Sequence, residues 1–346
     1  MVRFAAIAFI LAASAFAQSP SPKPSASPTT KELIDSLTPN DLQEAISLLK
    51  KNFTNPEAIN ETQLSRATIE GLIARLGPGL MLLPDKNAAT AENSAFYSEV
   101  LEKRAGYVRL GSLNANNLSS LDKKLGEFAE KKLGAVIVDL RASSGSDFDA
   151  TSQFAQRFIG KGKTLFTLRK QGKDRAFNSE RDPAYKNLVV VLADSETAGG
   201  AEALASALRF HDKALIIGQN TAGRAVEYSD LPLPSGKILR VAIAEVIGPD
   251  GKSLYPAGVK PDLPVEMSIL EKHQIFAASN EKGMMPFVNE TERPHLNEAA
   301  LIAGTNPELE SGEQRRGRAQ QTATPHDPMV QRALDLITSL EIYQKR

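Results

Sequence analysis

Side chains that commonly carry out catalysis are few in this 346-residue sequence, and none of them forms a familiar cluster. There is no cysteine, which excludes disulfide bonds, thiol nucleophiles and thiolate zinc sites. None of the four histidines stands in a spacing such as H-E-x-x-H, which places two zinc ligands on one helix. Asp147 and Asp149 precede a predicted helix, where carboxylates cap the helix more often than they bind a metal. We therefore expect no metal and no cofactor.

A turn that contains hydroxyl groups and glycines is the best candidate for a site. It follows a predicted strand and includes Ser195, Thr197, Gly199 and Gly200. A hydroxyl attacks a carbonyl only with a base in reach, and the next histidine and lysine come a helix length later. A helix that begins at Gly199 would offer unpaired backbone N–H groups and a partial positive charge, and glycines would let a ligand approach closely. A tight strand-to-helix turn without a ligand explains the same residues equally well.

Alternating strand and helix patterns surround this turn. Continuous apolar runs predict strands at residues 135–138, 188–192 and 214–217 that are covered on both faces. A shorter strand is predicted at 107–110. Apolar residues at helical spacing follow the strands at 107–110, 135–138 and 188–192. This order requires a mostly parallel, right-handed α/β layer. A longer strand is predicted at 237–246, after a hairpin turn.

The sequence before this layer predicts export and a small helical unit. Arg3, a short apolar run and the small residues before Ala17 are typical of a cleavable signal peptide, with a membrane anchor as the alternative. A Ser/Pro-rich tether follows. One helix is predicted to begin at Thr38 and another to end at Gly77, and their apolar stripes are expected to pack inward. We expect a periplasmic or secreted protein without an integral membrane segment after signal cleavage.

Charge and composition limit the partners. The 41 Lys and Arg residues balance 41 Asp and Glu residues, whereas a nucleic-acid-binding protein would show a basic excess. The basic run at residues 315–318 contains too few charges to bind a partner in salt. The sequence does not indicate an oligomeric state.

Four short segments of the sequence carry a resemblance to a known family. Each segment alone is a weak signal, but their combination and order are specific. The segments are Gly106-Tyr107-Val108-Arg109-Leu110, Val138-Asp139-Leu140-Arg141 with Gly145, Thr197 to Leu208 followed by Ala214 to Gly223, and Pro249-Asp250-Gly251-Lys252-Ser253 with Gly258-Val259-Lys260-Pro261-Asp262. Together they resemble the tail-specific, or C-terminal processing, serine peptidases. The resemblance implies an α/β core of the crotonase and Clp-protease type. Members of that family usually carry a PDZ domain before the core, but residues 84–105 are too few for a domain, so we expect it to be absent.

The resemblance and the composition together predict five divisions of the chain. They are a signal peptide at residues 1–17, a linker at 18–30, an N-terminal helical unit at 31–83, the peptidase-like α/β domain at 106–266, and a polar C-terminal extension at 267–346 that ends in a helix.

The resemblance also implies a serine nucleophile, a lysine base and a supporting glutamine, and all three positions differ here. The corresponding residues are Gly199, Arg224 and Tyr228. Glycine has no side chain to attack a carbonyl, and a guanidinium does not release a proton to become a base. The loop that helps to form the family's oxyanion hole is also changed, at Ala142-Ser143-Ser144.

We therefore expect a catalytically silent relative that binds peptide or unfolded protein, with the C-terminus held rather than cut. Arg224 would contribute a fork matched to a carboxylate, unless Glu202 or Glu227 pairs with it. One alternative is an active serine peptidase that uses a displaced nucleophile such as Ser195, and another is a non-enzymatic scaffold of the envelope. The candidate binding residues are Gly145, Gly199, Gly200 and Arg224.

Overall fold

The computed structural model describes residues 29–84, 94–211, 213–288 and 325–344. The predicted signal peptide, nearly all of the predicted tether and the basic run at 315–318 lie outside the described residues. Two compact units are present, one up to Thr68 and one from Ile69 onward. Within the described ranges, no helix is long and apolar enough to cross a lipid bilayer.

The first unit contains helices with well-formed starts. Helices α1 (Thr30–Asp35) and α2 (Pro39–Asn52) each begin with a capping box, in which the N-cap threonine and an acid three residues later exchange hydrogen bonds. The helix start predicted at Thr38 is thereby confirmed. A short 3-10 helix, η1 (Pro56–Ile59), leads into α3 (Glu61–Leu76), which continues into the second unit.

The apolar stripes of these helices are not buried, so our expectation that they form a core is wrong. Helices α1, α2 and α3 contain no buried residue. Leu42, Ile46 and Leu72 are 41–43% exposed. Helical spacing identifies the apolar face of a helix, but it does not show whether another element covers that face.

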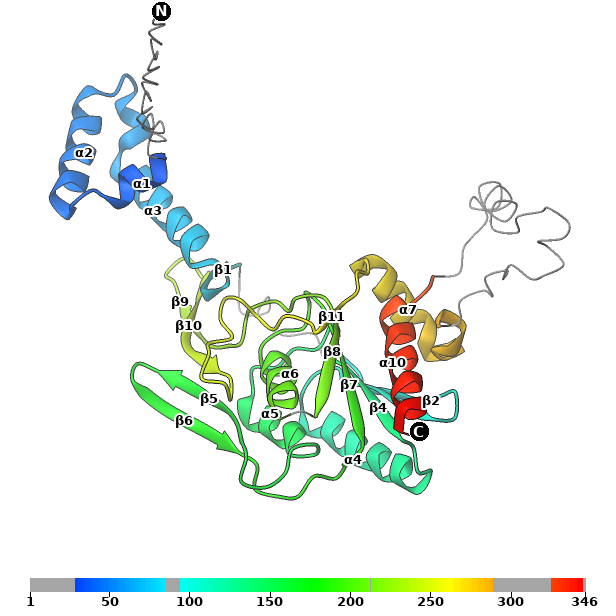
Figure 1. The fold of residues 1–346 in the computed structure, drawn as a ribbon. Coiled ribbons are helices and arrows are strands. Elements are labelled where there is room, and N and C mark those ends of the chain that lie inside the picture. The colour runs from blue at the N-terminus through cyan, green and yellow to red at the C-terminus, as the bar shows by residue number, and fades with distance from the viewer. Residues whose placement is uncertain (1–28, 85–93, 212, 289–324, 345–346) are drawn as a thin grey trace, which may run out of the picture. The chain divides into compact units, whose positions relative to one another are not determined.

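The second unit is built on a six-stranded sheet, and the sequence predicts four of its strands, β3, β4, β7 and β8 (Figure 1). Its order is β11-β8-β7-β4-β3-β2, and every neighbouring pair is parallel except β2 with β3. The strands are β2 (Tyr97–Leu101), β3 (Ala105–Arg109), β4 (Ala135–Asp139), β7 (Leu188–Ala193), β8 (Ala214–Gly218) and β11 (Leu263–Pro264).

Helices cover both faces of this sheet, and this explains why its central strands are apolar at consecutive positions. Along β4, Val136 and Val138 belong to one hydrophobic core, whereas Ala135 and Ile137 belong to the other. Successive side chains of a strand point to opposite faces, so both sets must be apolar. The first core includes α4 (Ala115–Glu130), α5 (Phe148–Ala155) and α6 (Gly200–Phe210), and the second includes α7 (Ile269–Lys282) and α10 (Pro328–Gln344).

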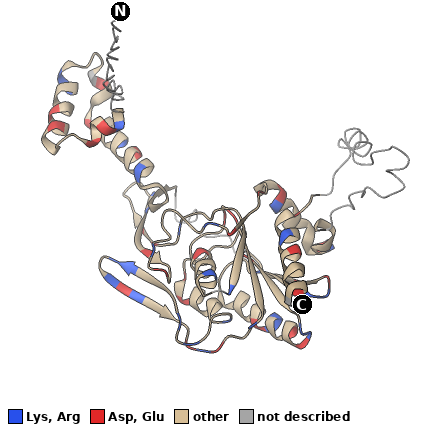
Figure 2. Cartoon of the chain, viewed as in Figure 1, with Lys and Arg blue, Asp and Glu red and all other residues tan. Residues whose placement is uncertain are grey.

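A second, antiparallel sheet supplies one wall of the site. Its order is β1-β10-β5-β6, and β9 also pairs with β10. The predicted long strand is confirmed as β10, but the others were not predicted. The strands are β1 (Leu80–Leu83), β5 (Thr164–Lys170), β6 (Lys173–Asn178), β9 (Val226–Pro232) and β10 (Ile238–Ile247). Two further 3-10 helices among the described residues are η2 (Gly77–Gly79) and η4 (Met285–Phe287). Acidic and basic residues are interspersed along the elements of the unit (Figure 2).

Candidate functional site

Four of the predicted site residues meet in one pocket beside the turn between β7 and α6. The pocket has a volume of about 670 Å³. It brings together Gly145, Gly199, Arg224 and Tyr228, which are far apart in the sequence. Gly200 does not line it, because its Cα faces Thr151 on α5, whose Oγ1 would lie 2.1 Å from an added Cβ. The other lining residues are Met81, Leu83, Ser144, Ser146, Ala198, Val226, Glu227, Asp230 and Arg240.

Gly199 stands where the resemblance places the nucleophile, and only glycine fits there. Its φ of 60° and ψ of −122° form a backbone conformation that residues with a Cβ rarely adopt. A Cβ on Gly199 would lie 2.3 Å from the carbonyl oxygen of Gly145. The Gly145 carbonyl therefore fills the space into which a nucleophilic side chain would have to project.

The loop after β4 lies directly on this turn and satisfies its backbone. The Gly145 carbonyl accepts a hydrogen bond from the Gly200 N–H at 2.7 Å, and the Ser143 carbonyl accepts one from the Ala198 N–H at 3.0 Å. The Gly199 N–H donates to Glu202 Oε2 at 3.0 Å. Our expectation of unpaired N–H groups at the start of this helix is therefore wrong. Buried N–H groups almost always have an acceptor, but sequence spacing does not reveal an acceptor from a distant loop.

Glu202 connects the position of the nucleophile to that of the base. Its side chain is fully buried and accepts hydrogen bonds from the N–H groups of Gly223 at 2.7 Å and Arg224 at 2.8 Å, and from the Thr221 hydroxyl. Burial raises the pKa of Glu202, although these hydrogen bonds oppose the shift. The sequence suggested Glu202 as an ion-pair partner of Arg224, but the carboxylate contacts the Arg224 backbone and not its guanidinium.

Arg224 presents an exposed charge at the pocket. Its guanidinium forms no hydrogen bond or ion pair with the part of the chain that the structure describes, and the other suggested partner, Glu227, instead lies 3.7 Å from Lys170 Nζ. Because a guanidinium stays protonated in proteins, this side chain can bind an anion but cannot accept a proton. Tyr228, at the position of the glutamine, donates its hydroxyl hydrogen to the Pro78 carbonyl at 2.8 Å.

The segment Asp139-Leu140-Arg141, at the end of β4, is held in place by a residue at the start of α10. The Arg141 guanidinium donates to Asp139 at 2.6 Å and to Asp327 at 2.8 Å, and all three side chains are buried. Burial alone would raise the pKa of Asp139, but the Arg141 charge and hydrogen bonds from Arg141 and Tyr107 lower it overall. Asp327 also caps α10. The sequence predicts a helix at the end of the C-terminal extension, but the contact of Asp327 with Arg141 has no local signal, because the two residues are 186 positions apart.

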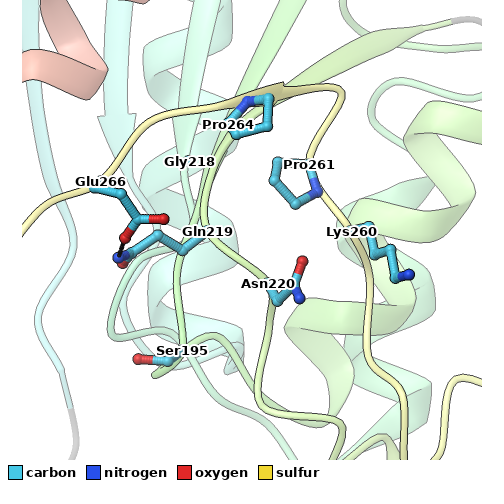
Figure 3. A pocket seen from close by; sticks show the side chains of 8 residues that line it. All are labelled: Ser195, Gly218, Gln219, Asn220, Lys260, Pro261, Pro264 and Glu266. Carbon is cyan, nitrogen blue, oxygen red and sulfur yellow. Dashed lines mark hydrogen bonds between the residues drawn. The ribbon is translucent and has the colours of Figure 1, made fainter.

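Ser195, the alternative nucleophile, lies in a different pocket of about 470 Å³ (Figure 3). Its side chain and that of Lys260 lie on opposite sides of this pocket (Figure 3). On either side of Ser195 in the sequence, Asp194 and Glu196 each bind Lys272 Nζ at 2.5 Å, and Glu196 also contacts His273 at 2.8 Å. Among the described residues, none forms a hydrogen bond with the Ser195 hydroxyl, so the structure places no base beside it.

Two other predicted side chains have structural contacts. The Thr197 hydroxyl is buried, donates to the Leu140 carbonyl at 2.9 Å and accepts from the Asp194 N–H at 3.0 Å. Asp147 caps α5 through the Ala150 N–H at 2.9 Å, which confirms the cap that its position predicts.

The parallel sheet, its two helical layers and the strand–turn–helix at Gly199 define a peptidase-like α/β core of the Clp-protease type. Residues 104–265 match the model of peptidase family S41, and the chain carries a domain of this family. The family resemblance seen in the sequence is thereby confirmed.

Relatives and a solved structure agree with this assignment. The chain is 27% identical to a carboxyl-terminal-processing protease of a Synechocystis species over 51% of this chain and 41% of that protein. It is 26% identical to a carboxy-terminal-processing protease of Bartonella bacilliformis over 66% of this chain and 56% of that protein. A putative peptidase from Parabacteroides merdae has the same fold, with a TM-score of 0.50, 16% identity, and coverage of 71% of this chain and 89% of that structure. The chain thus matches about half of the length of these two relatives.

Proposed function

We propose that this S41 domain binds peptide C-termini without hydrolysing them. The observation that carries the proposal is the pair Gly199 and Arg224 in one pocket, with the Gly145 carbonyl in the space of a nucleophile. Loss of a catalytic serine in a comparable hydrolase lowers turnover on the order of a millionfold. Here the base is also replaced by a group that stays protonated.

Recognition of a carboxylate is expected to depend on Arg224. With the turn N–H groups already bonded, its exposed guanidinium is the group in the pocket that is suited to a peptide terminus. Asp230 neutralises the other arginine of the pocket, Arg240, through two hydrogen bonds of 2.7 and 2.8 Å. Met81 and Leu83 supply apolar contacts from β1. A peptide chain could therefore lie along β1 with its carboxylate at Arg224.

Calorimetry with matched peptides tests this proposal. A peptide with a free C-terminal carboxylate is expected to bind roughly tenfold more tightly than its amidated form, because one charge-assisted hydrogen bond contributes about 1.5 kcal/mol or more. The Arg224→Ala variant should bind both forms equally, whereas Arg104→Ala, which removes an arginine that does not line the pocket, should behave as wild type. Equal affinity of the wild-type protein for the two peptides would contradict the proposal.

The same protein should not react with a fluorophosphonate probe and should not cleave peptides. Labelling that Ser195→Ala abolishes would establish the alternative, a displaced serine nucleophile. A protein that neither binds peptides nor reacts would favour the scaffold role.

Export is the second part of the proposal, and the pattern from Arg3 to Ala17 supports it. N-terminal sequencing of the protein recovered from an envelope or secreted fraction is expected to begin at Gln18. Recovery of the intact N-terminus from the cytosol would contradict export.

A further inference from the structure

The described part of the first unit, residues 29–68, contains no buried hydrophobic core. From residue 29 to residue 68 not one described side chain is buried, and only Ala45, Ile59 and Leu64 are half-buried. Eight other large apolar side chains of this segment are 41–54% exposed. They are Leu33, Ile34, Leu37, Leu42, Ile46, Leu48, Leu49 and Phe53.

A segment of this size needs an external surface to remain folded. Ordering the backbone costs roughly 1 kcal/mol or more per residue, and this cost is offset mainly by apolar burial. Single helices as short as α2 are marginal in water, and units below about 40 residues usually need a metal, a disulfide or oligomerisation. Cysteine is absent, and no group of three or more potential metal ligands occurs among the described residues. Of these three devices, oligomerisation is the one that the described residues can supply.

The pattern along α2 indicates what kind of surface would cover it. Leu42, Ile46 and Leu49 follow one another at spacings of four and three residues, which is the seam of a two-helix pair. The first part of α2 is acidic, at Asp41 and Glu44, and its last turn is basic, at Lys50 and Lys51. An antiparallel second copy would bring the acidic part of each helix near the basic part of the other, whereas a parallel copy would bring like charges together. The helix dipoles also favour the antiparallel arrangement.

From these observations we infer that α2 is a self-association surface, on which the α2 helix of a second copy of this chain packs antiparallel through Leu42, Ile46 and Leu49. The exposed apolar residues Leu33 and Ile34 of α1, and Leu37 just after it, enlarge this surface. A stable interface buries roughly 800 Å² per partner, which one helix of this length reaches only with such additional contacts.

Sedimentation velocity of the full chain tests the inference. The wild-type protein is expected to be a dimer that dissociates on dilution, and Ile46→Asp should convert it to a monomer. Ser47→Asp adds the same charge to the same helix outside the stripe and should remain a dimer. A wild-type protein that is monomeric at every concentration, or an Ile46→Asp variant that still associates, would overturn the inference.

Cross-linking provides a second measurement that does not depend on a disruptive variant. Because the chain has no cysteine, Ile46→Cys and Asn40→Cys each introduce a single thiol. In an antiparallel pair the two Ile46 positions are close to the symmetry axis, whereas the two Asn40 positions are roughly 20 Å apart along the helices. A short bismaleimide should therefore link Ile46→Cys dimers and not Asn40→Cys dimers. Equal linking of both variants, or of neither, would overturn the antiparallel pair.

Discussion

Gly199 is fixed by geometry as much as by the loss of a nucleophile. Gly199→Ala would place a Cβ against the Gly145 carbonyl oxygen, 2.3 Å away, at a φ of 60°. We expect a destabilisation of at least about 2 kcal/mol in urea unfolding, from backbone strain and overpacking together. Gly126→Ala is the matched control, since nothing lies within 4 Å of its added Cβ in the middle of α4, and it should stabilise by about 0.5–1 kcal/mol. Similar behaviour of the two variants would show that Gly145 yields easily.

Individual residues also mark where prediction from the sequence succeeds and where it stops. Aligning Gly199 and Arg224 with a known nucleophile and base places both at one pocket, because the strand–turn–helix framework fixes their positions. The sequence could not show that Gly145 fills the space between them or that Glu202 bonds three backbone N–H groups. Most of these contacts join loops that are distant in the sequence, where spacing carries no information.

At the scale of elements, Asp327 joins α10 to the loop that follows β4. Replacing it with alanine would leave the buried Arg141 guanidinium with Asp139 alone and would remove the cap of α10. Breaking a buried ion pair from one side costs about 3–5 kcal/mol, and we expect a loss of this size in chemical unfolding. Asp335→Ala, at an exposed position of the same helix, should cost less than about 0.5 kcal/mol. A small effect at Asp327 would mean that α10 is not coupled to this loop.

The same contact predicts how stability changes with pH. The pKa of Asp139 is lowered in the folded protein, so the folded state binds fewer protons there than the unfolded state, and stability is lost as pH falls below about 4. Glu202 acts in the opposite sense. Its pKa is raised in the folded protein, so the folded state holds its proton more tightly than the unfolded state, and stability falls as pH rises above the ordinary glutamate pKa of about 4.3. Asp139→Asn should therefore be less stable at neutral pH and lose stability less steeply in acid.

Unfolding free energies measured from neutral to acidic pH test this prediction. Asp174→Asn is the control, because Asp174 forms only a solvent-exposed pair with Arg169. An acid limb of equal slope in wild type and Asp139→Asn would assign the acid sensitivity to other carboxylates.

Elements differ in how well the sequence predicts them. The buried parallel strands β4, β7 and β8 are continuous apolar runs, and both their existence and the α/β class follow from that pattern. The antiparallel strands β1, β5, β6 and β9 are short or partly exposed, so no single periodicity identifies them. The sequence correctly predicts the apolar stripe of α2. The expectation that this stripe is buried within its own chain is wrong, because Leu42, Ile46 and Leu49 are exposed.

At the scale of the whole molecule, the catalytic residues of an S41 peptidase come from separate segments, and all of them must fit together. Restoring the side chains alone should therefore not restore hydrolysis. In the triple variant Gly199→Ser, Arg224→Lys, Tyr228→Gln, the serine Cβ still meets the Gly145 carbonyl. The start of the loop that carries Gly145 is also still fixed, because Asp139 and Asp327 still bind Arg141. We expect no peptide cleavage above background and no fluorophosphonate labelling.

The triple variant must be shown to be folded, because the Cβ of the serine introduced at position 199 carries the same steric cost as that of alanine. Circular dichroism of the triple variant and its binding of a free-acid peptide provide this check, since the lysine at position 224 keeps the positive charge. A folded variant that cleaves peptides would show that the loop at Gly145 moves away readily, and the lack of activity would then be due only to the replaced side chains. A folded but inactive variant would show that the loop itself keeps the site closed, so that reactivation would also require changing residues 142–146.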